Sequence, residues 1–524
     1  MSPPDETSLR AAFDKAGQSH VFAHWDKCSA DEQKALLAQL SEIDLSSVTS
    51  VFTRSMLDHE AGSSSKGDIE PVAADADVSN PEQSDTWHKA GLTAAANGTL
   101  AVVLLAGGQG TRLGSSAPKG MYDIGLPSGR TLFQLQCERL VKLQEDAEEL
   151  VRGEGKGKGQ SSEPGNPKVR VPLYVMTSPF THAVTKTYFE KNNHFGLDEA
   201  YVTFFQQGWL PCFSEGDDPE RNGKILMKSK SEVSTAPDGN GGVYKALMVN
   251  GCIADMEKKG IKHIYAYCVD NAAVKVGDPT FVGFNISHNF EAGAKVIQKA
   301  YAEEPVGVFI KRDNKVQVIE YSEMPGELNL ATDKNGNLKF NCANIVLHYY
   351  GIEFLRKCCD AEGLVQKTLS YHVARKKIPV VSDDGLMTQT PEKNNGVKLE
   401  AFIFDVYAFA ENVGFLNGER SHDFAPVKNK EGSGKDSPDT ARMILSSLHR
   451  RWIEKAGGKI VGEGPVEVSP ALSFDGKGLE NFANGKYFAA NQSIETDVWV
   501  ERKMISNEKK RKGEAVEDDR AKKK

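Results

Sequence analysis

The chain has 524 residues, too many for a single hydrophobic core, and its length predicts roughly two to four domains. Hydrophobic residues make up 39% and charged residues 26%, and the formal net charge of −8 argues against general binding to nucleic acid or acidic membranes. No apolar run approaches the ~20 residues that span a bilayer, and MSPPDETSLR lacks the pattern of a signal peptide, so we expect a cytoplasmic protein with no membrane partner.

The first 95 residues are predicted to form a helical region with one flexible segment. In SADEQKALLAQL, Ser29 is a candidate N-cap and Glu32 stands at the third helical position, which is the spacing of a capping box. From Ala61 to Asp85 serine, glycine, aspartate and proline accumulate, and this composition indicates a linker or surface loop.

Strands and helices alternate from Thr99 onward. TLAVVLLA, residues 99–106, is a continuous apolar run that is typical of a parallel strand buried on both faces. TLFQLQCERLVKLQ then predicts a helix whose capping pair is Thr131 and Gln134. Further strands are expected in the apolar runs at 171–177, 263–269, 305–310 and 343–350. This order predicts an α/β domain with a largely parallel sheet over residues 96–415.

The remaining segments carry weaker signals. VRGEGKGKGQSSEPGNP, residues 151–167, is predicted to be a flexible insertion without a functional role. After residue 414 the chain becomes loop-rich and contains short strand-like pieces such as GGKIVGEG and EVSPALSF. We predict a smaller β-containing C-terminal domain over 416–505 and a disordered, mixed-charge tail over 506–524.

The segment LAGGQGTRLGSSAPKGMY, residues 105–122, follows the first central strand and combines glycines with two cations. Glycine lets backbone N–H groups approach an anion, and the cations indicate that this anion is highly charged. A Walker A loop is excluded because Gly110 is followed by Thr-Arg, and a dinucleotide fingerprint is disfavoured because Leu113 occupies its third glycine position. Nucleotidyl transfer fits better, since Arg112 offers a planar fork and Lys119 a point charge to a departing pyrophosphate.

Other polar residues stand where ligands bind in α/β proteins. Asp270 ends the apolar run HIYAYCVD, and the carboxyl ends of strands are the usual ligand sites of an open α/β sheet. A carboxylate there suits Mg²⁺, although a helix N-cap is an alternative interpretation. Gln207 has an amide that can donate and accept together, but on the residue alone a surface position is the more common interpretation. The eight cysteines form no C-x-x-C pair, which argues against zinc and predicts inert thiols in a reducing compartment.

Taken in chain order, the motifs resemble those of the eukaryotic UDP-sugar pyrophosphorylases, and most closely the UDP-N-acetylglucosamine pyrophosphorylases. The similar stretches are L-x-G-G-x-G-T-R-L-G, PKGMYDIGLPSG, FFQQGWLPC, APDGNGGVYKAL, YCVDNAAVKVGDP, EPVGVFIKR, IEYSEMP, FNCANI, GVKLEAFIFD and FAPVKN. They span about residues 85–445. The resemblance implies a Rossmann-like nucleotide-sugar nucleotidyltransferase domain with a mostly parallel mixed sheet.

The resemblance also implies a role for individual residues. The cations that act on the phosphates would be Arg112, Lys119 and Lys428, and the metal ligand would be Asp270, with Asp405 at the end of FIFD as a weaker second carboxylate. The nucleotide would be bound by Leu105, Gly107, Gly108, Gln207 and Gly239, with the Gln207 amide matching the adjacent O4 and N3–H of uracil. The sugar would be bound by Asn240, Gly307, Glu320, Asn344, Phe402 and Phe404.

Two of these assignments carry structural expectations. Phe402 and Phe404 are expected to alternate along a strand, so that both point to one face and at least one lines the pocket beside an N-acetyl group. Lys428 is expected to belong to the C-terminal domain and to reach the phosphates only when that domain closes. One departure from the family pattern is the pair Ala272 and Ala273, where larger aliphatic residues are expected.

The reaction implied by the resemblance is the formation of UDP-N-acetylglucosamine and pyrophosphate from UTP and N-acetylglucosamine 1-phosphate, with Mg²⁺ or Mn²⁺. The nucleophile is a phosphate oxygen that is already anionic, so the absence of a His, Ser or Cys catalytic constellation is consistent with it. Two alternatives stay open. The sugar could be glucose 1-phosphate or N-acetylgalactosamine 1-phosphate, or the chain could be an inactive nucleotide-sugar-binding regulator, which the joint presence of Arg112, Lys119, Asp270 and Lys428 argues against.

Overall fold

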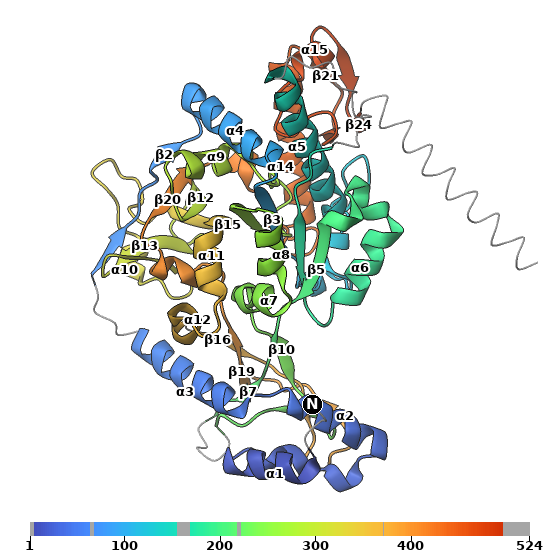
Figure 1. Cartoon of the computed structure of the whole chain (residues 1–524), viewed down its shortest axis with the longest axis vertical. Coiled ribbons are helices and arrows are strands. Elements are labelled where there is room, and N and C mark those ends of the chain that lie inside the picture. Colours follow the sequence, from blue (N-terminus) through green and yellow to red (C-terminus); the bar gives the residue numbers. More distant parts are fainter. Residues whose placement is uncertain (1–4, 63–67, 155–167, 217–221, 370, 496–524) are drawn as a thin grey trace, which may run out of the picture.

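At the centre of the molecule is a mixed β-sheet with helices on both faces (Figure 1). The computed structural model describes residues 5–62, 68–154, 168–216, 222–369 and 371–495. The predicted tail and most of the predicted insertion, at 155–167, lie outside these ranges. None of the described helices is long and apolar enough to cross a membrane.

The sheet is mostly parallel, as predicted. Its strand order is β2 (Ala76–Asp77), β20 (Val413–Asn417), β12 (Ala292–Gln298), β15 (Cys342–Gly351), β11 (His263–Cys268), β3 (Leu100–Leu105), β4 (Leu173–Thr177) and β5 (Val202–Gln206). Only β15 runs antiparallel to its neighbours in this row, β11 and β12. A side branch of antiparallel pairs joins β15 to β13 (Val308–Arg312), β14 (Lys315–Ile319) and β1 (Ile69–Pro71).

Alternate residues of β3 face two different cores, which explains why its sequence is continuously apolar. Leu100, Val102 and Leu104 pack in a core with residues of α4 (Pro81–Ala96), α5 (Leu132–Glu154) and α9 (Pro279–Ser287). Ala101 and Val103 pack on the other face with residues of α7 (Val243–Val249), α8 (Cys252–Lys258) and α11 (Ile352–Cys359). A strand covered on both sides has no face for polar residues.

Helix α4 belongs to the central core, although it lies within the predicted N-terminal region. Two glycines let it approach α9 closely: a Cβ on Gly91 would lie 2.0 Å from the carbonyl oxygen of Pro279, and a Cβ on Gly283 would lie 1.7 Å from that of Trp87. Backbone contact of this kind leaves no room for any side chain at either position.

The N-terminal helices pack on small sheets that protrude from the central domain. Helices α1 (Glu6–Lys15), α2 (Ala30–Ser41) and α3 (Leu45–Gly62) share a core with strands from the middle of the chain, and this core includes Phe13, Leu36, Phe213, Val397 and Leu399. The predicted capping box of Ser29 and Glu32 is confirmed at the start of α2. Thr131 accepts a bond from Gln134 N at the start of α5, but the Gln134 side chain donates to Glu138.

The small sheets hold the remaining strands of this part. They are formed by β16 (His372–Lys376), β19 (Gly396–Glu400) and β7 (Phe213–Ser214), by β6 (Trp209–Pro211) and β10 (Thr235–Pro237), by β8 (Met227–Ser229) and β9 (Glu232–Val233), and by β17 (Val380–Val381) and β18 (Thr388–Gln389). Short helices complete the domain: α6 (His182–Lys191), α10 (Gly326–Asn329), α12 (Leu364–Thr368) and α13 (Arg420–Asp423).

The segment predicted as a linker is partly a strand segment. Residues 69–71 form β1, which pairs with β13, and residues 76–77 form β2, which pairs with β20. Both pairings provide hydrogen-bond partners for backbone groups of β13 and β20. These pairings with distant strands make the segment extended despite its polar composition.

The C-terminal segment lies at the opposite end of the molecule from α1–α3 (Figure 1). It contains α14 (Pro438–Lys455), β21 (Lys459–Val461), β22 (Val466–Val468), α15 (Glu480–Ala483), β23 (Tyr487–Ala489) and β24 (Gln492–Ile494). The predicted strand-like pieces correspond to β21 and β22, whereas the long helix α14 was not predicted. The predicted boundary at 415/416 falls inside β20 of the main sheet.

A buried arginine fastens this segment to the central domain. Arg130, 1% exposed, lies 2.7 Å from Glu138, 3.4 Å from Glu467 and 3.1 Å from Glu495. Glu467 also accepts hydrogen bonds from the backbone N–H and hydroxyl of Ser128, each at 2.8 Å. A buried charge cluster of this kind resists separation, because breaking it would leave an uncompensated charge in the interior.

Candidate functional site

The predicted site residues gather at the carboxyl edge of the parallel strands. Leu105, at the end of β3, pairs with Cys268, at the end of β11, so the glycine loop and Asp270 leave the sheet side by side. Gln207 follows β5 at the same edge. Because ligands of open α/β sheets bind at this edge, the topology places three separate motifs where one substrate can reach them.

The glycine loop is closed by its own backbone and leaves Arg112 without an ion-pair partner among the described residues. Gly110 N donates to Ala117 O at 2.9 Å and Lys119 N donates to Gly108 O at 3.2 Å. A Cβ on Gly108 would have no described atom within 4 Å. Arg112 is exposed, and no described side chain forms an ion pair with it. The loop therefore presents an open backbone and an unpaired guanidinium.

Lys119 and Asp270 face each other beside this loop. Lys119 Nζ lies 3.7 Å from Asp270 Oδ2, and the two side chains are 19% and 23% exposed. Burial, reinforced by the charge of Asp270, raises the pKa of the nearby Cys268 thiol to about 12, and the charges of Lys119 and Lys428 oppose that rise. We call Gly108, Arg112, Lys119, Asp270 and Lys428 the phosphate end of the site.

Lys428 reaches the phosphate end from a segment that is bonded to the strand end carrying Asp270. Val427 N donates to Asp270 O at 2.8 Å, and Ala272 N donates to Ala425 O at 2.9 Å. Lys428 is therefore held against the central sheet by the backbone bridge between residues 271 and 426. The expectation that it reaches the phosphates when the C-terminal domain closes stays a prediction.

Asn271 and a buried ion cluster support this bridge. The Asn271 side chain donates to Asp423 O at 2.7 Å and accepts from Ala425 N at 2.9 Å. Lys295 Nζ lies 2.7 Å from carboxylate oxygens of both Asp278 and Asp423. Neighbouring lysine charges lower the pKa of Asp423 despite its burial. The segment that carries Lys428 is thus anchored through Asn271 to Asp423, which is itself paired with Lys295.

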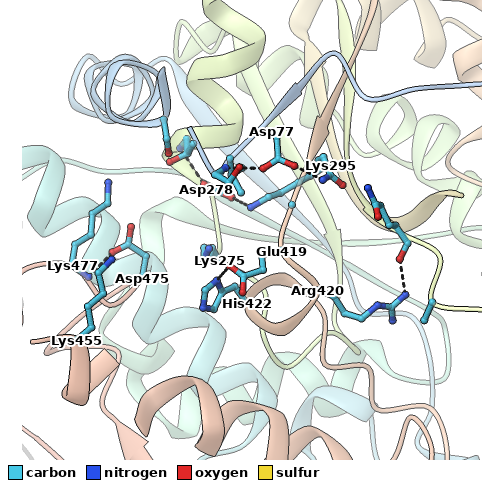
Figure 2. A pocket seen from close by; sticks show the side chains of 18 of the residues that line it. Asp77, Lys275, Asp278, Lys295, Glu419, Arg420, His422, Lys455, Asp475 and Lys477 are labelled. Carbon is cyan, nitrogen blue, oxygen red and sulfur yellow. Dashed lines mark hydrogen bonds and ion pairs between the residues drawn. The ribbon is translucent and has the colours of Figure 1, made fainter. Parts of the chain in front are cut away.

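Lys295 and Asp278 also line a second pocket of about 750 Å³ (Figure 2). Charged side chains surround it, but most of them pair with one another or with nearby residues: His422 with Glu419, and Arg420 with Glu304. None of the predicted site residues lines it. The pocket lies at the junction of β12, β20 and α14.

Ala272 and Ala273 pack under the phosphate end. Both are buried in one cluster with Leu113, Ala425 and Val427. Larger aliphatic side chains would occupy the space into which the 425–427 segment descends, so the departure from the family pattern is compensated by close backbone packing.

The glutamine after β5 is held in place by a neighbour that the sequence did not single out. Gln207 Nε2 donates to Asp238 Oδ1 at 3.1 Å and to Gly239 O at 2.9 Å, and burial raises the pKa of Asp238. A Cβ on Gly107 would lie 2.1 Å from Gln207 Oε1, so a larger residue there would displace the end of the Gln207 side chain. We call Gly107, Gln207, Asp238 and Gly239 the uracil end; Asp238 could have been found from its place in APDGNGG.

Gly239 and Asn240 link the uracil end to a turn after β19. Gly239 has φ +88°, and a Cβ there would lie 2.2 Å from the carbonyl oxygen of Ala401. Asn240 Oδ1 accepts a hydrogen bond from Ile403 N at 2.9 Å. Both residues therefore fix the turn at 401–404 against the nucleotide motif, and only glycine fits the first position.

Three predicted sugar-binding residues lie together near the start of β15. Asn344 N donates to Gly307 O at 2.9 Å, and a Cβ on Gly307 would lie 2.7 Å from Glu320 Oε1. Asn344 Oδ1 faces His348 Nε2 at 3.1 Å. Burial raises the pKa of Glu320, while the charges of His372 and Lys428 oppose that rise. We call Gly307, Glu320, Asn344, Phe402 and His372 the sugar end.

The prediction that Phe402 and Phe404 lie on a strand is wrong. Strand β19 ends at Glu400, and both phenylalanines lie in the turn that follows, with ring centroids 5.0 Å apart. Phe404 is buried and Phe402 is half-buried. The turn forms because Asp405 Oδ2 accepts a hydrogen bond from Phe402 N at 2.9 Å, and a carboxylate that captures a local N–H competes with a strand ladder.

Asp405 is consequently committed to the sugar end. Its second oxygen, Oδ1, lies 3.2 Å from His372 Nε2, so both carboxylate oxygens already have partners. The structure gives no support to Asp405 as a second carboxylate beside Asp270. Among the described residues no group of three or more His, Cys, Asp or Glu side chains could hold a metal ion.

The sequence matches a family described as UTP–glucose-1-phosphate uridylyltransferase over residues 46–463. It is 39% identical over 494 residues to a UDP-N-acetylglucosamine pyrophosphorylase of Saccharomyces cerevisiae, covering 92% of this chain and 98% of the yeast protein. It is 40% identical over 503 residues to UDP-N-acetylglucosamine diphosphorylase 2 of Arabidopsis thaliana, covering 93% and 94%. The crystal structure of the uridine diphosphate N-acetylglucosamine pyrophosphorylase from Trypanosoma brucei superposes with a TM-score of 0.77 at 29% identity, covering 95% of this chain and 99% of that one.

Proposed function

The chain belongs to the UTP–glucose-1-phosphate uridylyltransferase family, and on this premise we propose that it forms UDP-N-acetylglucosamine and pyrophosphate from UTP and N-acetylglucosamine 1-phosphate. The observation that supports the proposal is the order of the site residues along the carboxyl edge of the main sheet: Gln207 follows β5, the glycine loop and Asp270 follow β3 and β11, and Asn344 lies near the start of antiparallel β15. A nucleotide, its phosphates and a sugar need these three surroundings in that order.

The chemistry requires alignment and neutralisation of charge. An oxygen of the sugar phosphate attacks the α-phosphate of UTP and pyrophosphate leaves, so the bond to the sugar phosphate forms as the bond to pyrophosphate breaks. The attacking oxygen is already anionic, and no general base is needed. Arg112, Lys119 and Lys428 bind the phosphates and stabilise the charge that develops on the leaving group. Gln207 and Glu320 hold the two substrates in line.

Asp270 is the residue that we propose to hold Mg²⁺ or Mn²⁺. Its carboxylate is partly exposed and faces Lys119, which fits an ion that prefers one or two carboxylates and completes its shell with substrate phosphates. When bound, the ion would neutralise phosphate charge. Asp405 has no part in this role, because both of its oxygens have other partners.

The relatives' names and the half-buried ring of Phe402 favour the N-acetylated sugar. An aromatic ring beside the polar groups of Glu320 and Asn344 suits a substrate with both hydroxyl groups and an acetamido group. For the location we propose the cytoplasm. The eight cysteines are all free thiols, which supports a reducing compartment.

The experiment that tests this proposal measures pyrophosphate release by the purified full-length chain from UTP, Mg²⁺ and a panel of sugar 1-phosphates. We expect the highest kcat/KM with N-acetylglucosamine 1-phosphate and no release by Asp270→Asn. A preference for glucose 1-phosphate or N-acetylgalactosamine 1-phosphate would overturn the choice of sugar. Tight binding of UDP-N-acetylglucosamine without release from any sugar would indicate a regulator.

A further inference from the structure

His372 occupies a place in the sugar end that none of the sequence motifs indicated. It is the first residue of β16 and pairs with Glu400, the last residue of β19, just before the turn that holds Phe402. Its side chain is 22% exposed. The residue therefore reaches the sugar end from a strand that lies outside the main sheet.

The imidazole is held on two edges and one face. Its Nε2 lies 3.2 Å from Asp405 Oδ1 and its Nδ1 lies 3.4 Å from Glu323 Oε1. Its face stacks on the ring of Phe402, with centroids 4.2 Å apart and planes inclined by 29°. The ring of Phe404 lies edge-on at 6.5 Å. Few orientations of the imidazole satisfy all of these contacts together.

Both nitrogens face carboxylate oxygens, so both must carry a proton. The hydrogen bonds and charges of Asp405 and Glu323 accordingly raise the pKa of His372 to about 10, against the effect of its burial. Other charges act on the same group of carboxylates: Lys428 and Glu323 affect Glu320, and Arg312 and His59 affect Glu323. A charged imidazolium over an aromatic face is a cation–π contact.

From this geometry we propose that His372 is a positioning residue for the sugar substrate, a role that rests on the proposed function. It clamps one face of Phe402, so that the opposite face stays in place for the acetamido group. Through Asp405 it also fixes the turn whose backbone N–H that carboxylate accepts. The contacts of His372 are with residues around the sugar end and with none of the phosphate-end cations, so we expect its effect to be on selection of the sugar.

A purely structural role would give a different kinetic result. If His372 only joined β16 to the turn, its replacement would lower thermal stability and affect both substrates alike. If it positions Phe402, its replacement should weaken binding of the sugar 1-phosphate and leave binding of UTP unchanged, because the Gln207 side chain is held by hydrogen bonds to Asp238 and Gly239 that do not involve His372.

Two variants of His372 remove different contacts. His372→Phe keeps a ring over Phe402 and removes both N–H donors, whereas His372→Gln keeps a donor and removes the ring. His288→Phe is the matched control. That histidine also stacks on a phenylalanine, Phe290, but it follows α9 next to the amino end of β12, at the opposite edge of the sheet.

The measurements are KM for UTP and for N-acetylglucosamine 1-phosphate, kcat/KM for glucose 1-phosphate, the Kd of UDP-N-acetylglucosamine by calorimetry, and the Tm. We expect each His372 variant to raise KM for the N-acetylated sugar and the Kd about tenfold and to reduce its preference over glucose 1-phosphate, with KM for UTP within about twofold. His288→Phe should change none of these constants.

Unchanged sugar KM and Kd in both variants, or an equal rise in KM for the two substrates, would overturn the proposal even if the Tm falls. These outcomes differ from failure of the proposed function, in which the wild-type chain itself releases no pyrophosphate. A wild-type chain that neither turns over nor binds UDP-N-acetylglucosamine overturns both.

Discussion

At the phosphate end Arg112 is exposed and has no ion-pair partner among the described residues, and the Lys119–Asp270 pair is 3.7 Å apart. At the uracil and sugar ends the polar groups are already bonded within the protein: Gln207 to Asp238, and His372 to Asp405. The phosphate end therefore has an unpaired cation available to a ligand, while the polar side chains of the other two ends are already held in place.

We attribute this difference to what each end is proposed to recognise. A uracil and a sugar have fixed patterns of donors and acceptors, and a site whose side chains are already held loses little conformational entropy on binding. Polyphosphate is highly charged, so exposed cations on a glycine backbone are enough to attract it. We therefore expect changes at the phosphate end to affect turnover, and changes at the preformed ends to affect stability and substrate binding.

The largest effect should come from removal of the proposed metal ion. EDTA should abolish turnover and leave the Tm unchanged, because no described cluster of three or more candidate ligands could bind an ion as part of the fold. Pyrophosphate release and differential scanning fluorimetry measure the two quantities. A fall in Tm on chelation would reveal a structural metal and would contradict the contrast between the ends.

Removal of a phosphate-end cation should come next. Lys119→Ala and Arg112→Ala should each lower kcat by about 10²- to 10³-fold, the scale on which preorganised charge stabilises a transition state. The free energy of unfolding should change by less than about 0.5 kcal/mol, because both side chains are partly or fully exposed. Lys455→Ala, in the second pocket, is the control and should keep wild-type kcat. Near wild-type turnover in either site variant would refute our reading of the loop.

Two glycine substitutions, one at the uracil end and one at the phosphate end, should differ in their effects on stability and on KM for UTP. Gly239→Ala should lower the free energy of unfolding by about 3 kcal/mol, because its Cβ would lie 2.2 Å from backbone oxygen at φ +88°. Gly108→Ala should leave stability unchanged, since its Cβ meets open space, but should raise KM for UTP about tenfold by obstructing the backbone. Urea unfolding and steady-state kinetics measure both; equal losses of stability would remove the distinction.

The smallest effects concern the bridge that carries Lys428. Lys428→Ala should lower kcat about tenfold with little change in Tm. Asn271→Ala should lower kcat and also reduce the free energy of unfolding by about 2 kcal/mol, because its buried side chain bonds to Asp423, Ala425 and Ala273. Normal turnover by a destabilised Asn271→Ala protein would mean that the position of Lys428 does not depend on the bridge.

Local signals predicted the elements that local physics determines. The apolar runs, the capping box at Ser29 and the position of Asp270 after β11 follow from residues close together in the chain. The helix α14 also has a local signal, because Ser437 and Pro438 form a typical helix start; it was obscured by the loop-rich sequence around it.

Non-local contacts account for what the sequence could not indicate. Antiparallel β15 is set by which strands flank it, and no pattern within FNCANI specifies that direction. His372 acquires its place from Asp405, Glu323 and Phe402, which are 30 to 49 positions away. The wrong prediction at Phe402 has a local origin. The sequence around it alternates as in a strand, but the Phe402 N–H donates to Asp405 Oδ2 and a turn forms instead.

The short strands β1 and β2 have a consequence for how the protein behaves in solution. They cover backbone groups of β13 and β20, which would otherwise be open to another molecule. An uncovered strand edge is a template for pairing with a second chain. Removal of residues 1–80 would leave the whole glycine loop intact but would expose these strand edges. We therefore expect the truncated protein to self-associate.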